Sequence, residues 1–184
     1  DRIRAASRLF DVIRIDHFRG LESYWAVPYG EPTARNGRWV KGPDHDFINR
    51  LHEVFPGLRL IAEDLGFLTE AVIQLQHDSG YPGMKVLEFA FDPREPSNYL
   101  PHRYPTNCIC YSGTHDNETL VQWIDGANDE VRAYAAEYLG TTPDKLREGI
   151  LRAGLSSVAD TFIAQMQDYL GLGASARKNT PGTV

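Results

Sequence analysis

Four short apolar runs, three of which lead into acidic residues, are the feature that most restricts how this chain can fold. These runs are expected to form strands, at residues 11–16, 58–62, 84–91 and 108–112. They alternate with segments of helical periodicity, and such alternation is typical of a parallel sheet with helices packed outside it. The sequence therefore predicts an α/β fold with about four parallel strands and outer helices.

Cap residues mark most of the helices that are expected between and after these runs. Loops are expected at residues 20–43 and 92–107, which are rich in proline and other turn-forming residues. The pattern shows no repeat or linker, which indicates one continuous architectural unit over residues 1–184. Three helices are expected in the first half of the chain: one at 1–10, one that Asp44 or Asp46 caps and Pro56 stops, and one from Thr69 to Gly80. Four more are expected after the last apolar run: 118–125, 129–139, 143–152 with Thr142 as its cap, and one from Ser156 or Ser157 to Gly171.

The composition excludes several classes of protein. The net charge is −6 and no cluster of lysine and arginine is present, which argues against a nucleic-acid partner. No apolar run has the length of a membrane span, and no secretory signal opens the chain. Cys108 and Cys110 alternate along one apolar run and indicate buried, reduced thiols, as in a cytoplasmic protein. A Cys-x-Cys metal site is the alternative, but no further cysteine supports it.

Both ends of the sequence suggest a piece of a longer chain. Asp1 falls inside an expected helix, no initiator methionine is present, and the last residues resemble a turn with nothing after it. We therefore expect a domain that is truncated at both ends. Such a piece has unpaired strand edges, so it is expected to show no useful activity in isolation.

Carboxylates follow three of the four expected strands. Asp16 ends the first, Glu63 follows the second, and Asp116 lies shortly after the fourth. Active sites of parallel α/β folds form where the carboxyl ends of several strands meet. Arg14 lies two residues before Asp16 and is expected on the same face of its strand. From this segment alone, an ordinary ion pair and an activated carboxylate are equally good interpretations.

Glycoside chemistry fits these groups, because it needs one ionised carboxylate and one protonated carboxyl group. Arg14 favours the charged form of Asp16, whereas Glu63 follows an apolar run whose surroundings would raise its pKa. His115 and Asp116 are suited to bind sugar hydroxyls. Asp64 is expected to face away from Glu63 and to make a supporting hydrogen bond.

The rival chemistry is that of a metal-dependent hydrolase on a similar barrel, with His17 and His115 among its ligands. No two histidines have the H-x-H or H-x-x-x-H spacing, and Arg14 would repel a cation. The sequence therefore predicts no metal and no cofactor.

Five motifs carry a resemblance to one known family. They are RIDHFRG at 14–20, YWAVP at 24–28, IAEDLG at 61–66, GTHDN at 113–117 and NTPGT at 179–183. In this order they resemble the 4-alpha-glucanotransferases, also called amylomaltases or disproportionating enzymes, of the alpha-amylase superfamily. One departure is Lys178, where that family often has methionine.

The resemblance implies the fold and the partners. The fold would be the second half of a (β/α)8 TIM barrel, with the N-terminal strands missing. The substrates would be α-1,4-glucans and malto-oligosaccharides, with glucose or maltose as acceptor. An α-glucan hydrolase and a non-catalytic fragment are the alternatives.

The resemblance also assigns roles to individual residues. Asp16 would be the nucleophile, Glu63 the acid/base and Asp116 the stabiliser of the transition state. The expected substrate-binding residues are Arg14, His17, Trp25, His115 and Asn117. From the residues alone, a place for Trp25 in the core of its loop is narrowly favoured over stacking on a sugar, and Asn117 could equally cap the next helix.

Overall fold

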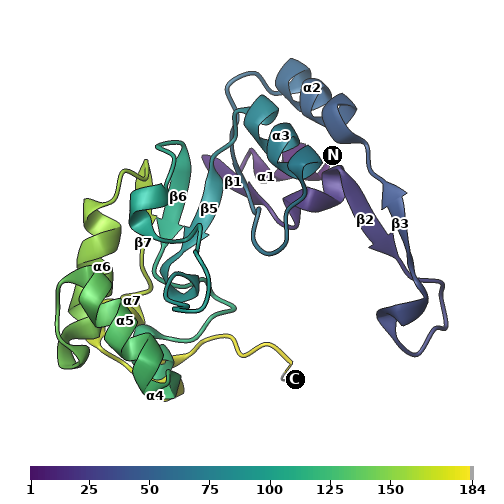
Figure 1. Cartoon of the computed structure of the whole chain (residues 1–184). Coiled ribbons are helices and arrows are strands. Elements are labelled where there is room, and N and C mark those ends of the chain that lie inside the picture. The colour runs from purple at the N-terminus through teal and green to yellow at the C-terminus, as the bar shows by residue number, and fades with distance from the viewer. Residues whose placement is uncertain (183–184) are drawn as a thin grey trace. The chain divides into compact units, whose positions relative to one another are not determined.

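The computed structural model describes residues 1–182, and the chain forms two compact units, Asp1–Met84 and the part from Lys85 onward (Figure 1). The sequence pattern had indicated one continuous unit, and it contains no linker at the boundary. The elements of the first unit are α1 (Arg2–Ala6), β1 (Val12–Ile15), β2 (Ser23–Ala26), β3 (Arg38–Lys41), α2 (Asp44–Val54), β4 (Arg59–Ala62) and α3 (Glu70–Ser79).

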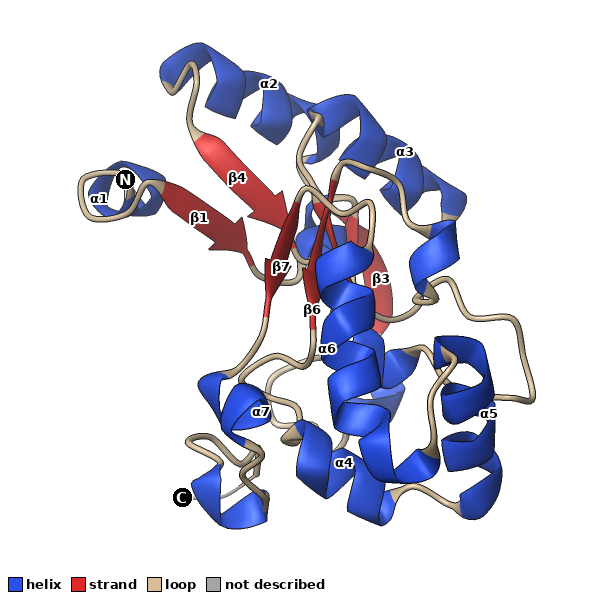
Figure 2. Cartoon of the chain, turned by 90° about the vertical axis from the view of Figure 1, so that its left-hand side faces the viewer, coloured by secondary structure: helices blue, strands red, loops and turns tan. Residues whose placement is uncertain are grey.

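A parallel pair of strands forms the centre of the first unit. β1 and β4 pair in register from Val12 opposite Arg59 to Ile15 opposite Ala62. Figure 2 shows α2 and α3 lying side by side along this pair. Apolar side chains from the helices and from β4 are buried together, among them Leu51, Leu60 and Leu75. The two strands predicted at 11–16 and 58–62 are therefore confirmed, each slightly shorter than expected.

The predicted end residues are correct for α3 and wrong for the start of α2. Thr69 caps α3 by accepting a hydrogen bond from the Val72 N–H, and Gly80 ends it in the left-handed conformation, both as predicted. The prediction that Asp44 or Asp46 caps α2 is wrong, because Pro43 occupies the cap position. The Asp44 carboxylate instead pairs with Lys41 at 2.6 Å.

A β-hairpin lies where the sequence predicted a loop at 20–43. β2 and β3 are antiparallel, and Trp25 lies directly opposite Trp39. Their rings meet edge to face, with centroids 5.4 Å apart. Residues 27–37 separate the two strands, a connection much longer than the tight turns by which a hairpin is recognised in a sequence. Contact between two aromatic side chains far apart in sequence supplies the stability that local propensity does not predict.

The second unit contains a sheet in the order β5-β6-β7, and β5 begins in the last residues of the first unit. β6 and β7 are parallel, with Cys110 opposite Phe162. Helices of this unit pack around a core that includes Leu87, Leu120 and Ile150. The elements are β5 (Gly83–Val86), β6 (Cys108–Tyr111), α4 (Leu120–Gly126), α5 (Asp129–Leu139), α6 (Leu146–Ser156), β7 (Thr161–Ile163) and α7 (Met166–Leu170).

Two predictions in this unit need correction. The strand expected at 84–91 ends at Val86, and the chain continues in a 3-10 turn, Leu87–Phe89. The long last helix is instead the strand β7 followed by the short helix α7. The apolar spacing of Val158, Phe162 and Met166 imitates a helix. Phe162, however, packs on Gly154, where any Cβ atom would overlap its ring.

The helices between β6 and β7 follow the prediction closely. α5 has the predicted bounds, and Asn128 caps it. α4 begins at Leu120 with Thr119 as its cap, two residues later than expected. Thr142 and Pro143 begin a 3-10 turn, and the α-helix follows from Leu146. Within residues 1–182, no helix combines the length and the apolar character that crossing a bilayer requires.

The two cysteines are buried thiols that form no disulfide, as predicted. Burial raises the pKa of the Cys110 thiol to about 12. Because the thiolate is the reactive form, Cys110 is expected to resist alkylation at pH 8 in the folded protein and to react rapidly in denaturant. Labelling with iodoacetamide before and after denaturation, followed by peptide mass spectrometry, measures this. Rapid labelling of Cys110 in the folded protein would contradict the expectation.

Candidate active site

The carboxyl ends of β1 and β4 lie at the same edge of their sheet, because the two strands are parallel. Asp16 follows β1 and Glu63 follows β4. The backbone continues the pairing past the strands, since the Glu63 N–H donates to the Ile15 carbonyl at 3.0 Å. The Phe18 N–H donates to the Glu63 carbonyl, also at 3.0 Å. The structure therefore brings these two predicted site residues together on one edge.

Arg14 and Asp16 share a face of β1, as the strand periodicity predicts. The Arg14 guanidinium donates to the Asp16 carboxylate at 2.9 Å. The Arg14 side chain is 29% exposed and that of Asp16 is 77% exposed. Asp16 is thus an accessible side chain that the partly buried Arg14 guanidinium contacts from one side. This contact agrees with both interpretations of the sequence, the ion pair and the activated carboxylate.

The backbone of His17 connects the two strand ends. His17 has a left-handed conformation, with φ of 49° and ψ of 53°. Its N–H donates to Glu63 Oε2 at 2.6 Å, while the Leu65 N–H donates to Glu63 Oε1 at 3.1 Å. Two backbone donors thereby fix the orientation of the Glu63 carboxyl group, which is half-buried. The contribution of His17 seen in the structure is made by its backbone, and substrate binding by its side chain stays a prediction.

Substitution of His17 tests the cost of this conformation. A β-branched residue is strained at positive φ, so His17→Val is expected to lower the free energy of unfolding by about 1–3 kcal/mol. Glycine adopts this conformation readily, and His17→Gly is the matched control. Urea unfolding of both variants in a full-length enzyme measures the difference. Equal stability of the valine and glycine variants would contradict the assignment of strain to residue 17.

Asp64, two residues after β4, connects the end of this strand to the chain at Met84. Its Oδ1 accepts a hydrogen bond from the Met84 N–H at 2.6 Å. Gly83 makes this approach possible, because a Cβ atom there would overlap the Asp64 carboxylate. The prediction that Asp64 makes a supporting hydrogen bond is confirmed. Asp64 thereby fastens the strand end that carries Glu63 to the chain entering β5.

Trp25 is held in the hairpin and remains partly exposed. Its Nε1–H donates to the Ala34 carbonyl at 2.8 Å, and 41% of the residue is accessible. Its partner Trp39 lies under the Arg19 guanidinium, 4.6 Å from the ring centroid. Both ordering within the loop and stacking on a sugar are compatible with these contacts.

His115 and Asp116 lie in the second unit, in the loop that follows β6, and both are exposed. His115 Nε2 and Asp116 Oδ2 are 3.3 Å apart. The Asn179 amide donates to Asp116 Oδ1 at 2.8 Å and to the His115 carbonyl at 3.2 Å. Arg177 donates to the Asp116 carbonyl at 3.1 Å. The C-terminal segment therefore orients the two predicted site residues.

The sequence did not single out Arg177 and Asn179 as site residues. The available signal was the NTPGT motif at 179–183, which contributes to the family resemblance. Thr183, its last residue, lies outside the described residues.

Asn117 closes the turn that carries His115 and Asp116. Its Oδ1 accepts hydrogen bonds from the Thr114 N–H at 2.9 Å and from the Thr114 hydroxyl at 2.6 Å. The alternative that Asn117 caps the next helix is wrong, because Thr119 has that position. Contact between Asn117 and a substrate stays a prediction.

A buried polar network lies beneath this loop. Asp168 on α7 is fully buried and accepts hydrogen bonds from the Ser112 hydroxyl at 2.6 Å and the Leu120 N–H at 2.8 Å. The Gln165 amide donates to the Thr114 and Glu118 carbonyls at 3.2 and 3.1 Å. Sequence reasoning missed this network, since it expected residues 165 and 168 within one long helix, where β7 and α7 lie in the structure. The network fixes both ends of the loop.

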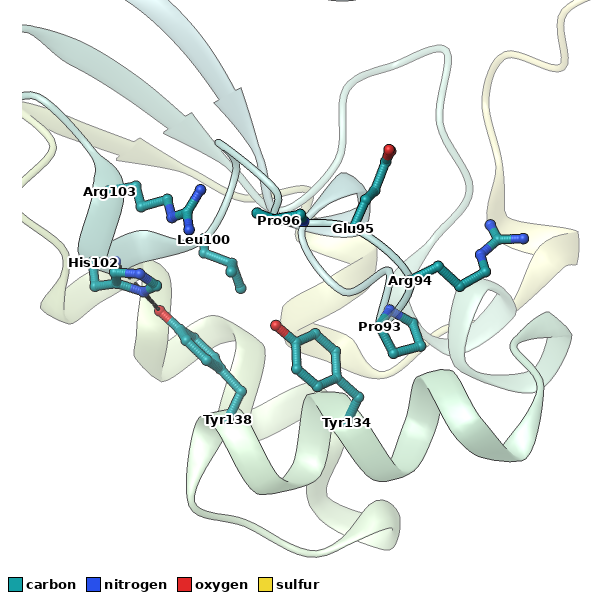
Figure 3. Close-up of a pocket in the computed structure, with 9 residues that line it drawn as sticks. All are labelled: Pro93, Arg94, Glu95, Pro96, Leu100, His102, Arg103, Tyr134 and Tyr138. Atoms are coloured by element: carbon teal, nitrogen blue, oxygen red, sulfur yellow. Dashed lines mark hydrogen bonds between the residues drawn. The ribbon is translucent and has the colours of Figure 1, made fainter.

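In the part of the chain that the structure describes, neither a metal ion nor the pocket drawn in Figure 3 adds to the predicted site. Within residues 1–182, no three His, Cys, Asp or Glu side chains are placed to hold a metal ion. A pocket of about 370 Å³ lies between the loop after β5 and α5 (Figure 3). The Tyr138 hydroxyl and His102 Nδ1 are 2.8 Å apart there. None of the predicted site residues lines this pocket.

The whole sequence is similar to one family of enzymes. The family model described as 4-alpha-glucanotransferase matches residues 1–184. The chain is 46% identical to the 4-alpha-glucanotransferase of Clostridium butyricum, covering 100% of this chain and 38% of that protein. It is 42% identical to the 4-alpha-glucanotransferase of Thermus thermophilus, covering 98% of this chain and 38% of that protein. The chain therefore spans less than two-fifths of the length of these relatives.

Solved structures show the same similarity in three dimensions. An amylomaltase from Streptococcus agalactiae, solved in complex with acarbose, superposes with a TM-score of 0.93 at 37% identity. It is covered over 37% of its length, while all of this chain is matched. The amylomaltase of Corynebacterium glutamicum shares the fold, with a TM-score of 0.75. The predicted α/β architecture is thereby confirmed as similar to that of amylomaltase.

Proposed function

This chain belongs to the 4-alpha-glucanotransferase family, and on that premise we propose that a full-length enzyme carrying it transfers α-1,4-glucan segments to the 4-hydroxyl of an acceptor sugar. The observation that carries the proposal is the arrangement of Asp16 and Glu63 on one strand edge. The His17 N–H and the Glu63 N–H connect the two strand ends. An accessible carboxylate beside a fixed carboxyl group is what retaining glycoside chemistry requires.

The first step of the proposed reaction forms a covalent glycosyl-enzyme. Asp16 attacks the anomeric carbon of the donor, and the bond from that carbon to the glycosidic oxygen breaks. Glu63 gives its proton to the departing oxygen. Arg14 holds the Asp16 carboxylate in position, because its guanidinium lies 2.9 Å from that group.

The second step returns the enzyme to its starting state. Glu63, now ionised, takes the proton of the acceptor 4-hydroxyl, and the acceptor oxygen attacks the anomeric carbon as the bond to Asp16 breaks. Two inversions give net retention. The Leu65 N–H bond to Glu63 holds the carboxylate in place between the two steps.

Asp116 and His115 are proposed to bind hydroxyl groups of the sugar whose anomeric carbon reacts. Such hydrogen bonds accelerate the reaction only where they strengthen in the transition state. The bonds from Asn179 and Arg177 to this loop support the role, since they restrict where Asp116 can lie. Asn117, Trp25 and the His17 side chain are proposed as further substrate contacts.

The assignment to a part of the barrel belongs to the same proposal. We assign residues 1–184 to the second half of a (β/α)8 barrel, as an incomplete catalytic domain, because all three proposed reacting carboxylates lie within it. The remaining strands would come from a part of the enzyme outside this sequence. The buried thiols of Cys108 and Cys110, which form no disulfide, support a cytoplasmic location.

Maltotriose tests whether the enzyme transfers or hydrolyses. A transferase converts maltotriose into shorter and longer oligosaccharides and glucose, whereas a hydrolase gives only shorter products. Chromatography of the products of a full-length enzyme separates the two results. Chain lengths above three support the proposal, and glucose and maltose alone would reject transfer in favour of hydrolysis.

A further inference from the structure

Glu88 is a buried carboxyl group that the reaction proposed above does not use. It lies in the 3-10 turn Leu87–Phe89, directly after β5, and is only 7% exposed. Its N–H donates to the Ser112 carbonyl at 3.3 Å, at the end of β6. Among the described residues, its Oε1 atom has no hydrogen-bond partner. A buried polar atom without a hydrogen-bond partner lowers the stability of the folded protein, so the presence of a carboxyl group at this position needs an explanation.

Glu88 lies against the first residue of the loop that carries His115 and Asp116. A Cβ atom added to Gly113 would lie 2.6 Å from Glu88 Oε1 and 3.1 Å from its carboxyl carbon. Gly113 has no positive φ, so it is not required here for backbone conformation. The close approach of the Glu88 carboxyl group explains why residue 113 has no side chain.

The charged groups around Glu88 disfavour its ionisation. Asp168 from α7 and Glu118 from the segment before α4 act on it with negative charge, and the positive charge of Arg177 opposes them. Burial, with the negative charges of Asp168 and Glu118, raises the pKa of Glu88 to about 9. Glu88 is therefore uncharged at pH 7.

We propose that Glu88 is a positioning residue that supports the loop at residues 113–117 and thereby places His115 and Asp116 for the transfer reaction. This inference rests on the proposed function, because it takes Asp116 as a participant in the reaction. An ionised Glu88 would be repelled by Asp168 and Glu118 and would draw water beneath Gly113. Either movement would displace the loop while leaving Asp16 and Glu63 unchanged.

The first test compares Glu88→Gln with the parent full-length enzyme over a range of pH. Glutamine keeps the size of the side chain and cannot ionise. Other groups titrate in both proteins. The kcat of Glu88→Gln divided by the kcat of the parent therefore isolates the effect of ionising Glu88. We expect this ratio to rise about tenfold between pH 7 and pH 10, because one unit above its pKa about nine-tenths of the parent would carry an ionised Glu88. Glu137→Gln, on an exposed part of α5, is the control and is expected to give a constant ratio.

The second test uses the contact with Gly113. Gly113→Ala is expected to lower kcat by about 100-fold with a smaller change in KM, since a displacement of about 1 Å in an active site has an effect of this size. Adding Glu88→Ala makes room for the new methyl group and is expected to restore at least part of that loss. Thermal unfolding of each variant shows whether the enzyme assayed is folded.

The results of these tests distinguish a failure of this inference from a failure of the proposed function. A parent enzyme that does not redistribute maltotriose would reject both. An active parent with a constant Glu88→Gln ratio, and with no recovery in the double variant, would reject the positioning role alone. A rising ratio together with recovery of kcat supports it, because a merely stabilising residue would alter unfolding without a pH-dependent change in kcat.

Discussion

Replacement of Asp16 by alanine in a full-length enzyme is expected to lower kcat for maltotriose by about 10⁴-fold or more, because the covalent intermediate can no longer form. Asp16 is the accessible carboxylate that Arg14 contacts at 2.9 Å. The loss is expected in kcat rather than in KM, since the substrate-binding residues remain. Steady-state kinetics with maltotriose, measured on folded protein, gives both values.

Azide distinguishes a missing nucleophile from a damaged site. In the Asp16→Ala enzyme, azide is expected to attack an activated α-maltosyl fluoride directly and to give the β-glycosyl azide. Asp11→Ala is the matched control, because Asp11 is an exposed carboxylate just before the same strand. That variant is expected to keep the parent kcat. Residual transfer by Asp16→Ala within tenfold of the parent would exclude Asp16 as the nucleophile.

Replacement of Glu63 by alanine is expected to have the second largest effect, a loss of about 10²–10⁴-fold with maltotriose. The loss comes from the missing proton transfer to the departing oxygen. Fluoride needs little protonation to depart, so the first step with α-maltosyl fluoride is expected to be largely preserved. The covalent intermediate then accumulates, because no base activates the acceptor.

Azide again gives a specific result with the Glu63 variant. Azide needs no base, so it is expected to attack the accumulated intermediate, restore turnover and give the α-glycosyl azide. Glu70→Ala, an exposed residue in the first turn of α3, serves as the control. Equal losses with maltotriose and with α-maltosyl fluoride would contradict the acid/base role. A β-glycosyl azide from this variant would contradict it as well.

Sequence reasoning located the Asp16 and Glu63 strand ends because the signals there are local. The β-branched run before Asp16 and the apolar run before Glu63 predict strands, and period-two alternation places Arg14 beside Asp16. The ends of α3 followed from Thr69 and Gly80 for the same reason, since the cap bond of Thr69 and the left-handed conformation of Gly80 are local to that helix.

Features that depend on contacts between distant segments could not be predicted in this way. The hairpin needs Trp25 to meet Trp39, and β7 needs β6 as its partner. The hydrogen bond from Asn179 to Asp116 joins residues 63 positions apart. The uncharged state of Glu88 depends on burial and on Asp168, which the sequence placed on an unrelated helix. The structure was needed to bring each of these pairs together.

Trapping the glycosyl-enzyme tests the central proposal most directly. The Glu63→Gln variant of a full-length enzyme would be mixed with α-maltosyl fluoride, quenched in acid, digested and analysed by mass spectrometry. We expect a maltosyl adduct on the peptide that contains Asp16, with fragment ions placing the sugar on the Asp16 side chain. An adduct on another residue such as Asp116, or turnover of the fluoride without any adduct, would contradict the account.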